Sequence, residues 1–148
     1  MLRIRTQAER IGELLPLAGV FLNVGGHEVC LGVPRVRALM PALVLMSRLV
    51  TIKGFTEPEP FLEAAGRQLE ALGISGRASI PPVSGGPRAG LLQRRVLRIK
   101  GVSIVGFALV IEDLTPEGSE RLLVHGLGGR RHMGCGIFVP VRSTGGRR

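Results

Sequence analysis

The segment from Gly126 to Gly136, GLGGRRHMGCG, combines two features that suit the binding of an anion. Arg130 and Arg131 supply guanidinium groups, whose donors match the oxygens of a phosphate. Glycine lets the backbone approach a ligand closely and present its N–H groups. The alternative is a flexible, solvated turn, but anion binding is favoured because glycines and arginines converge in one loop. The glycines of this loop are Gly126, Gly128, Gly129, Gly134 and Gly136.

His132 lies in the same loop and is the best acid–base candidate among the three histidines of the chain. An imidazole can exchange a proton near neutral pH, which suits general acid–base catalysis. A lone loop histidine also commonly contacts a phosphate or a base, so both roles stay open. His125 is expected to cap a helix C-terminus and His27 to lie in a turn.

The motifs in this sequence do not indicate a nucleotide cofactor or a metal site. The glycine-rich loop lacks the Gly-Lys-Ser/Thr of a Walker A loop and the strand-then-helix setting of a dinucleotide site. Cys30 and Cys135 lie far apart and show no zinc-ligand spacing, so neither a metal nor a disulfide is predicted. A reduced, cytoplasmic protein without a bound cofactor is therefore expected.

A second set of basic residues lies on a predicted hairpin that turns near Lys100-Gly101. Arg94, Arg98 and Lys100 share strand parity, so they could form a positive stripe along a polyanion. An ordinary solvated hairpin face is equally compatible with these residues. Lys53 follows a buried strand and is either part of the same site or simply solvent-facing. The basic residues considered for RNA binding outside the glycine-rich loop are Lys53, Arg94, Arg95, Arg98 and Lys100.

The charge distribution points to a polyanionic partner. The 148 residues carry a net charge of +9, and residues 94–148 contribute ten basic and four acidic side chains. A basic end of this kind attracts nucleic acid. The longest apolar stretches fall well short of the ~20 residues that a membrane-spanning helix needs, so no membrane partner is predicted.

The N-terminal part predicts a short strand, a helix and a glycine hairpin. Residues 2–5 suit a strand, and a capping box from Thr6 to Glu9 predicts a helix over residues 7–15. The β-prone runs 20–23 and 28–31 flank Gly25-Gly26, which favours a tight turn.

The C-terminal part predicts alternating strands and helices. A buried strand is expected within residues 42–53, followed by a helix that ends at Gly73. Further expectations are a strand near 78–80, the hairpin over 94–114, a helix over 117–125 capped by Thr115, and a strand over 136–142. This order is the split βαβ pattern of ferredoxin-like domains, so an α+β fold with two helices on one face of an antiparallel sheet is predicted.

Three stretches taken together resemble a known family: GLGGRRHMGCGIF after a helix, the hairpin RRVLRIKG…IVGFAL, and LVTIKGFTEPEPFLEAA. They are similar to the CRISPR repeat-processing endoribonucleases of the RAMP superfamily, and to their Myxan subtype in particular. The resemblance runs from about Leu2 to Val141. It implies tandem ferredoxin-like (RRM-like) domains, an incomplete one over residues 1–40 and a complete one over 41–148. A strand and a helix bearing a catalytic histidine are expected upstream of Met1.

The resemblance also implies an activity and a partner. Such proteins bind CRISPR repeat RNA in precursor crRNA and cleave it without a metal, through attack of a 2′-hydroxyl that leaves a cyclic phosphate. Other subunits of a CRISPR effector complex are a further partner class. Two alternatives stay open, which are a noncatalytic RNA-binding subunit of a CRISPR ribonucleoprotein complex and a basic ferredoxin-like protein that binds other structured RNA.

Overall fold

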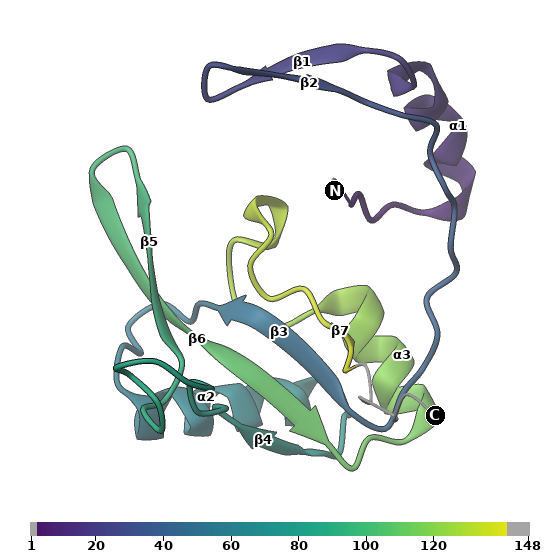
Figure 1. Ribbon diagram of the computed structural model, residues 1–148. Coiled ribbons are helices and arrows are strands. Elements are labelled where there is room, and N and C mark those ends of the chain that lie inside the picture. The colour runs from purple at the N-terminus through teal and green to yellow at the C-terminus, as the bar shows by residue number, and fades with distance from the viewer. Residues whose placement is uncertain (1–2, 142–148) are drawn as a thin grey trace, which may run out of the picture. The chain divides into compact units, whose positions relative to one another are not determined.

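The computed structural model describes residues 3–141 and divides the chain into two compact units, Met1–Ala38 and Leu39–Arg148 (Figure 1). Each unit is described by itself below. Within the described residues, no helix has the length and apolar character needed to cross a membrane.

The N-terminal unit consists of a short helical segment and a two-stranded hairpin. Gly25 and Gly26 both have positive φ angles, +59° and +85°, which the tight turn of the hairpin requires. The predicted hairpin is therefore present, with His27 as the first strand residue after the turn. The elements are η1 (Ala8–Arg10), α1 (Ile11–Leu14), η2 (Leu15–Leu17), β1 (Phe21–Val24) and β2 (His27–Cys30).

Two N-terminal predictions were wrong. Arg3–Arg5 form no strand, because no segment of this unit pairs with them, and Leu2 lies outside the described residues. The expected capping box between Thr6 and Glu9 is not formed either. The helical segment opens as a 3₁₀ turn whose N-cap, Gln7, makes no side-chain hydrogen bond.

The C-terminal unit is a five-stranded antiparallel sheet with the strand order of a ferredoxin-like domain. The order is β4-β6-β3-β7, and β5 pairs with the first half of the long strand β6. Figure 1 shows α2 and α3 behind this sheet. The elements are β3 (Leu45–Val50), α2 (Pro58–Ala71), β4 (Arg77–Ser79), β5 (Arg94–Ile99), β6 (Val102–Glu112), α3 (Pro116–His125), η3 (Arg131–Met133) and β7 (Val139–Pro140). The predicted α+β fold is thus confirmed.

The helices of this unit begin and end where the sequence predicts. The Thr115 side chain accepts a 3.0 Å hydrogen bond from the Gly118 N–H and so caps α3. Gly73 has a φ of +64° after α2, and its N–H donates to the Glu70 carbonyl. Both helices cover a core in which the rings of Phe61 and Phe107 lie 4.8 Å apart.

The last strand is shorter than the predicted 136–142. Gly136 has a φ of +66° and donates its N–H to the Leu49 carbonyl, so it belongs to the preceding loop. Pro140 has no N–H to extend the pairing with β3. Arg142 lies outside the described residues.

Candidate nucleic-acid interface

The glycine-rich loop, residues 126–136, is tied to the end of β3 and to α2. The Gly128 N–H donates to Oε1 of Gln68 at 2.9 Å, and the Gly129 N–H donates to the Thr51 carbonyl at 2.8 Å. The Thr51 hydroxyl donates in return to the Gly129 carbonyl at 3.3 Å. The Gly136 N–H donates to the Leu49 carbonyl at 2.7 Å. These contacts give the loop a defined position on the sheet.

The glycine N–H groups form hydrogen bonds within the protein in this structure, so the predicted anion binding by the loop depends on its side chains. Besides the three just named, the Gly126 N–H donates to the Leu122 carbonyl and the Gly134 N–H to the Arg131 carbonyl, both at 2.9 Å. The backbone N–H groups of all five loop glycines thus donate hydrogen bonds within the protein.

The glycines allow close backbone packing instead. A Cβ on Gly128 would lie 2.5 Å from the Thr51 carbonyl oxygen, which is closer than real Cβ contacts. A Cβ on Gly136 would overlap the Leu127 carbonyl, and one on Gly126 would overlap the carbonyl of Gly136. Glycine is needed at these positions because backbone faces backbone.

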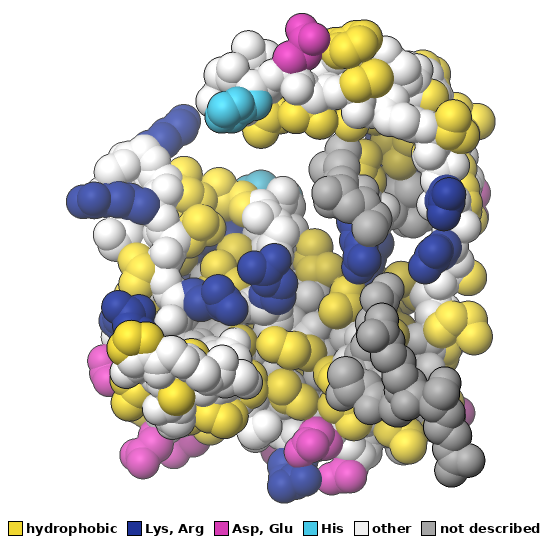
Figure 2. All heavy atoms as spheres, viewed as in Figure 1, with side chains coloured by type: hydrophobic (Ala, Val, Ile, Leu, Met, Phe, Trp, Pro, Cys, Tyr) yellow, Lys and Arg dark blue, Asp and Glu magenta, His cyan; other side chains and the backbone are white. Residues whose placement is uncertain are grey.

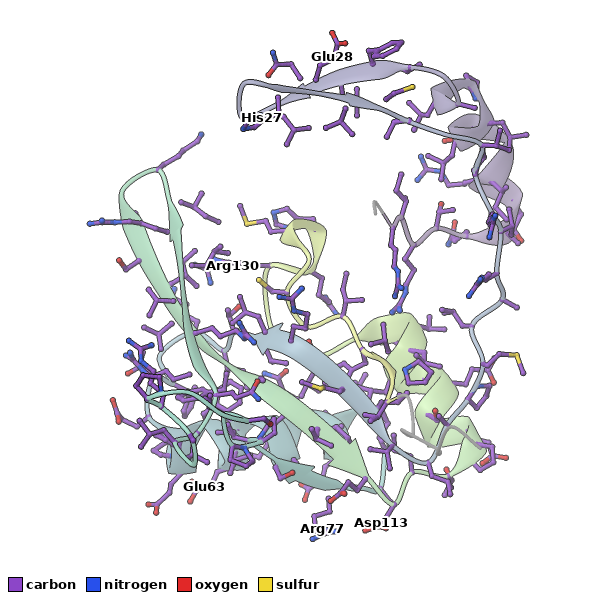
Figure 3. The ribbon with its side chains drawn as sticks, in the orientation of Figure 1. His27, Glu28, Glu63, Arg77, Asp113 and Arg130 are labelled. Atoms are coloured by element: carbon purple, nitrogen blue, oxygen red, sulfur yellow. The ribbon has the colours of Figure 1, made fainter. Side chains whose placement is uncertain are left out.

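Arg130 and Arg131 have different surroundings. Arg130 has a left-handed backbone, φ +57°, and its carbonyl accepts from the N–H groups of Met133 and Cys135. Its guanidinium is exposed, makes no ion pair with any described residue, and lies on the loop side that faces the β5–β6 hairpin (Figure 3). The Arg131 guanidinium donates to the His125 carbonyl at 2.6 Å, at the C-terminus of α3. Arg130 is thus available to an anion, whereas Arg131 fastens the loop to the helix.

His132 lies exposed in the 3₁₀ turn of the loop. Among the described residues, no side chain or backbone group forms a hydrogen bond with its imidazole. The ring is accessible to a substrate but is not oriented by a partner.

The hairpin carries its basic side chains on both faces and at its tip. Arg94 pairs with Phe107 and Arg98 with Ser103, so these two arginines share a face, and Arg95 lies on the other. Lys100 has a φ of +48° and lies in the turn, which removes it from the predicted stripe. All four side chains are exposed.

The base of the hairpin meets the glycine-rich loop at the end of β3. A Cβ on Gly106 of β6 would lie 2.7 Å from Cδ1 of Leu49 and 2.9 Å from Cγ2 of Thr51. Lys53 follows two residues after Thr51, in an exposed turn. The structure therefore brings Lys53, the loop and the hairpin base to one end of the sheet, while Arg98 and Lys100 extend away from it.

Three further residues contribute here that the sequence reasoning did not single out. Arg48 lies exposed in the register shift of β3 between Ser47 and Val50, and its charge within an otherwise apolar run was a usable signal. Thr51 and Gln68 hold the loop, and no local pattern marks either of them.

Most charges of the C-terminal unit are segregated, except that Arg67, Arg77 and Arg121 lie on or beside the elements that carry the acids. We define the basic surface as Arg48, Lys53, Arg94, Arg95, Arg98, Lys100, Arg130, Arg131 and His132. The ion pairs found among the described residues of this unit join Arg77 to Glu112 and Asp113 and involve no member of the basic surface. Figure 2 shows Lys and Arg side chains gathered over the hairpin and the loop, with Asp and Glu below them. The acids lie on or beside the helices and at the end of β6: Glu57, Glu59, Glu63, Glu70, Glu112, Asp113, Glu117 and Glu120.

The loop cysteine is not placed for nucleophilic chemistry. The Cys135 side chain is 1% exposed, and its burial raises the pKa of the thiol, although the Arg130 charge opposes that rise. In the part of the chain that the structure describes, no three His, Cys, Asp or Glu side chains are grouped to hold a metal ion.

Comparison with known proteins now identifies the family. A family model described as Cas6 Crispr matches residues 1–143. The chain belongs to the Cas6 family. The CRISPR-associated endonuclease Cas6 of Myxococcus xanthus (strain DK1622) is 40% identical over 139 residues, which cover 94% of this chain and 56% of that Cas6 protein. The chain thus spans a little over half the length of this relative. The predicted resemblance to the CRISPR repeat-processing family is confirmed.

Proposed function

We propose that this chain binds CRISPR repeat RNA and cleaves it as an endoribonuclease during the processing of precursor crRNA. The observation that carries the proposal is the convergence of the hairpin, the glycine-rich loop and the end of β3 into one basic surface. A surface without internal ion pairs keeps its charges available for phosphates. Membership of the Cas6 family supports repeat RNA over other structured RNA as the ligand.

Binding is proposed to depend on phosphate contacts and on the shape of the RNA. Lys53 follows Thr51 by two residues, and Arg130 follows Gly129, which is hydrogen-bonded to Thr51, so both lie near the end of β3. The arginines of the hairpin extend this surface. A guanidinium group can donate two hydrogen bonds to two oxygens of one phosphate. Such contacts do not distinguish one base from another. The loop glycines contribute by setting the position of Arg130 rather than by touching the RNA.

The proposed reaction is an internal transesterification of the RNA. The 2′-oxygen attacks the adjacent phosphorus, and the bond from phosphorus to the 5′-oxygen breaks as the new bond forms. The proton of the 2′-hydroxyl passes to a general base, and another proton is given to the leaving 5′-oxygen. The products carry a 2′,3′-cyclic phosphate and a 5′-hydroxyl. Arg130 and Lys53 would stabilise the negative charge that grows on the phosphate.

His132 is the proposed acid–base residue because it lies within the basic surface. One observation favours the alternative of a noncatalytic RNA-binding subunit. No described residue orients the imidazole, whereas a catalytic base is normally held by a third group. Under that alternative, the same surface binds RNA and the chain supplies no general base for catalysis.

The proposed domain organisation agrees with the proposed binding and cleavage of RNA. We propose that residues 1–40 belong to an N-terminal ferredoxin-like domain and that residues 41–148 form a C-terminal one. The division between Ala38 and Leu39 and the strand order of the second unit support this assignment.

Cleavage of repeat RNA with defined chemistry tests the proposal. We expect the chain to cut a repeat hairpin in EDTA and to leave the same RNA intact when the scissile nucleotide carries a 2′-deoxy ribose. Binding should be the same for both substrates because the phosphates are unchanged. Efficient cutting of the deoxy substrate, or strict dependence on Mg²⁺, would refute the mechanism. Binding without any cutting would support the noncatalytic alternative.

A further inference from the structure

The outer side of β4 is an open sheet edge. β4 is the first strand in the order β4-β6-β3-β7, so only one of its sides pairs with β6. In an antiparallel pair each strand directs N–H and C=O groups alternately toward its partner and away from it. Apart from the pairing with β6, no backbone hydrogen bond within the range 3–141 involves the N–H or C=O groups of residues 75–80. β4 therefore offers backbone donors and acceptors to another strand.

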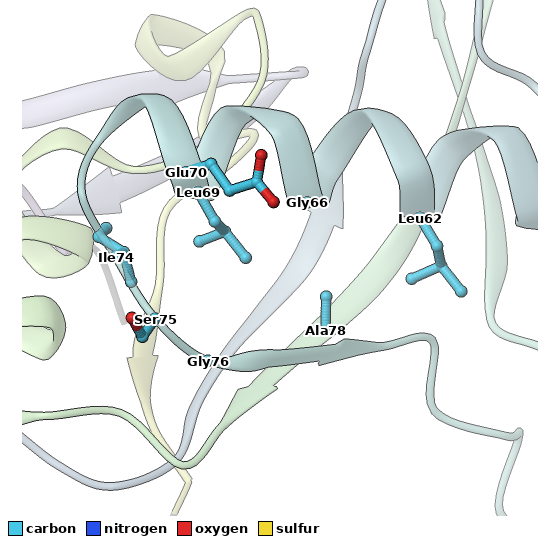
Figure 4. Close-up of a pocket in the computed structure, with 8 residues that line it drawn as sticks. All are labelled: Leu62, Gly66, Leu69, Glu70, Ile74, Ser75, Gly76 and Ala78. Carbon is cyan, nitrogen blue, oxygen red and sulfur yellow. The ribbon is translucent and has the colours of Figure 1, made fainter.

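A groove of about 420 Å³ runs between this edge and α2 (Figure 4). Leu62 and Leu69 project into it from the helix, and Ala78 faces them from β4. The space above Gly66 is empty, since no atom lies within 4 Å of a Cβ built there. The volume lies in the lower part of the range of ligand pockets, roughly 300–1,000 Å³. It suits one or two side chains of a bound segment.

The α2 side of the groove carries carboxylates, of which Glu70 lines the groove, while Arg77 on β4 is paired with Glu112 and Asp113. Glu59, Glu63 and Glu70 lie on the same side of α2 as Gly66, because they are spaced by about whole helical turns. None of these carboxylates forms an ion pair with a described residue. The neighbouring Arg67 is stacked over the ring of Phe55, 5.7 Å from its centroid. A polyanion such as RNA is repelled by the carboxylates of α2, whereas Lys or Arg side chains are attracted to them.

We propose that the groove between α2 and β4 docks an extended, basic segment of another protein. The segment would add a strand to β4 through backbone hydrogen bonds and insert an apolar side chain beside Gly66. Its alternate residues would place positive charges against Glu59, Glu63 and Glu70. Strand addition beside a helix gives affinity through the backbone and selectivity through the pocket. This docking does not depend on the proposed RNA cleavage, because it uses none of the basic surface.

The test uses the full chain and a labelled peptide of alternating arginine and apolar residues, Arg-Val-Arg-Leu-Arg-Val-Arg, blocked at both ends. One control peptide is N-methylated at its apolar residues, and a second is N-methylated at its arginines. Each change removes the backbone N–H groups along one edge of the extended peptide. A third control has the same composition with all arginines first. We expect the alternating peptide to bind, and we expect at least one N-methylated form and the unalternated form to lose tenfold or more in affinity.

Variants of the groove locate the binding. Gly66→Leu fills the open space and should lower affinity by about tenfold or more, since burial of the apolar side chain is lost. Glu70→Lys should lower affinity by roughly two- to fivefold. Glu120→Lys on α3 makes the same charge change away from the groove and should change affinity by less than twofold. Urea unfolding checks that the variants fold, and Gly66→Ala serves as a smaller substitution if the leucine does not.

Three results would overturn the proposal. Equal binding of all four peptides, or an unchanged affinity in Gly66→Leu, would mean nonspecific charge attraction. Weaker binding of repeat RNA by a folded Gly66→Leu variant would assign the groove to nucleic acid. Concentration-dependent self-association in sedimentation, lost in Gly66→Leu, would assign it to a second copy of the chain. RNA cleavage by Gly66→Leu at the rate of the unmodified chain would separate this surface from the proposed reaction.

Discussion

The two units of the chain differ in whether they can bury a core. In the C-terminal unit, Phe107 is fully buried against Phe61, and aliphatic side chains of both helices surround them. In the N-terminal unit, no residue from 3 to 38 is buried, and Phe21 on the hairpin is 63% exposed. Both units contain hairpins with the turn residues that such hairpins need.

The difference shows that correct local structure and independent stability are separate properties. A two-stranded hairpin is only marginally stable in water, because it has no second layer against which to pack. The C-terminal sheet has two helices on one face, and the hydrophobic burial of that layer offsets the conformational entropy lost on folding. Most of the free energy of unfolding of this chain should therefore come from residues 39–141.

Truncation of one phenylalanine in each unit tests this difference in core burial most directly. Phe107→Ala should lower the free energy of unfolding by about 3–5 kcal/mol, because it leaves a cavity in the core. Phe21→Ala removes an exposed ring and should change it by less than about 0.5 kcal/mol. Urea unfolding monitored by circular dichroism measures both values. Equal losses in the two variants would show that the hairpin of the N-terminal unit packs into a core of its own.

A second comparison uses the histidines, since His132 and His27 are both exposed and lie in different units. His132→Ala should lower the single-turnover rate of RNA cleavage in EDTA by roughly 10²- to 10⁴-fold, the usual contribution of general acid–base catalysis. RNA affinity should be largely kept. His27→Ala is the matched control and should leave the rate within twofold. An unchanged rate in His132→Ala would exclude this residue as the base.

The two arginines of the glycine-rich loop are also expected to have different roles. Arg130→Ala should flatten the plot of log affinity against log salt by about one unit, because one phosphate contact is lost. Arg131→Ala should change that slope much less. It should instead destabilise the fold by about 0.5–1.5 kcal/mol through loss of the hydrogen bond to the His125 carbonyl. Binding titrations over a salt series and urea unfolding distinguish the two effects, and equal slopes in the two variants would contradict this division.

The smallest effect concerns the two cysteines, one in each unit. Cys30 is exposed and Cys135 is buried, so iodoacetamide should modify Cys30 first in the native chain. Burial raises the pKa of the Cys135 thiol, so the folded state keeps that proton to higher pH than the unfolded state does. The resulting stability is present below pH ~8.5, the pKa of an unfolded thiol, and is lost as the pH rises above it. Mass spectrometry of peptides from a modification time course tests the order of reaction.

Much of the C-terminal fold follows from short stretches of sequence. The helix that ends at Gly73, the Thr115 cap and the turn at Lys100-Gly101 each depend on residues within a few positions of one another. Such features are predictable because the atoms that satisfy the backbone are supplied locally. The wrong prediction of a strand at Arg3–Arg5 has the opposite cause, since a strand exists only if a distant segment pairs with it.

Charge and spacing alone single out the basic residues of the loop and the hairpin as candidates, and their role in RNA binding stays a prediction. The role of the loop glycines was not found, because the groups that accept their N–H bonds lie far away in the sequence. Gln68 is 60 positions from Gly128, and Thr51 is 78 positions from Gly129. Only the folded sheet shows that these glycines are packing residues.

The length of β6 sets how far the hairpin extends from the hydrophobic core. One end of this strand is fixed in the core by Leu109 and Ile111, and the other continues to Val102 at the tip. At about 3.4 Å per residue, the five steps from Phe107 to Val102 place the tip roughly 17 Å from Phe107, and Ile104 between them is still buried. Adding one residue to each strand would move the tip outward and reverse which face carries the arginines, whereas adding two would move it and keep the face. Two-residue increments in this hairpin would therefore change its reach while the arginine face and the core stay the same.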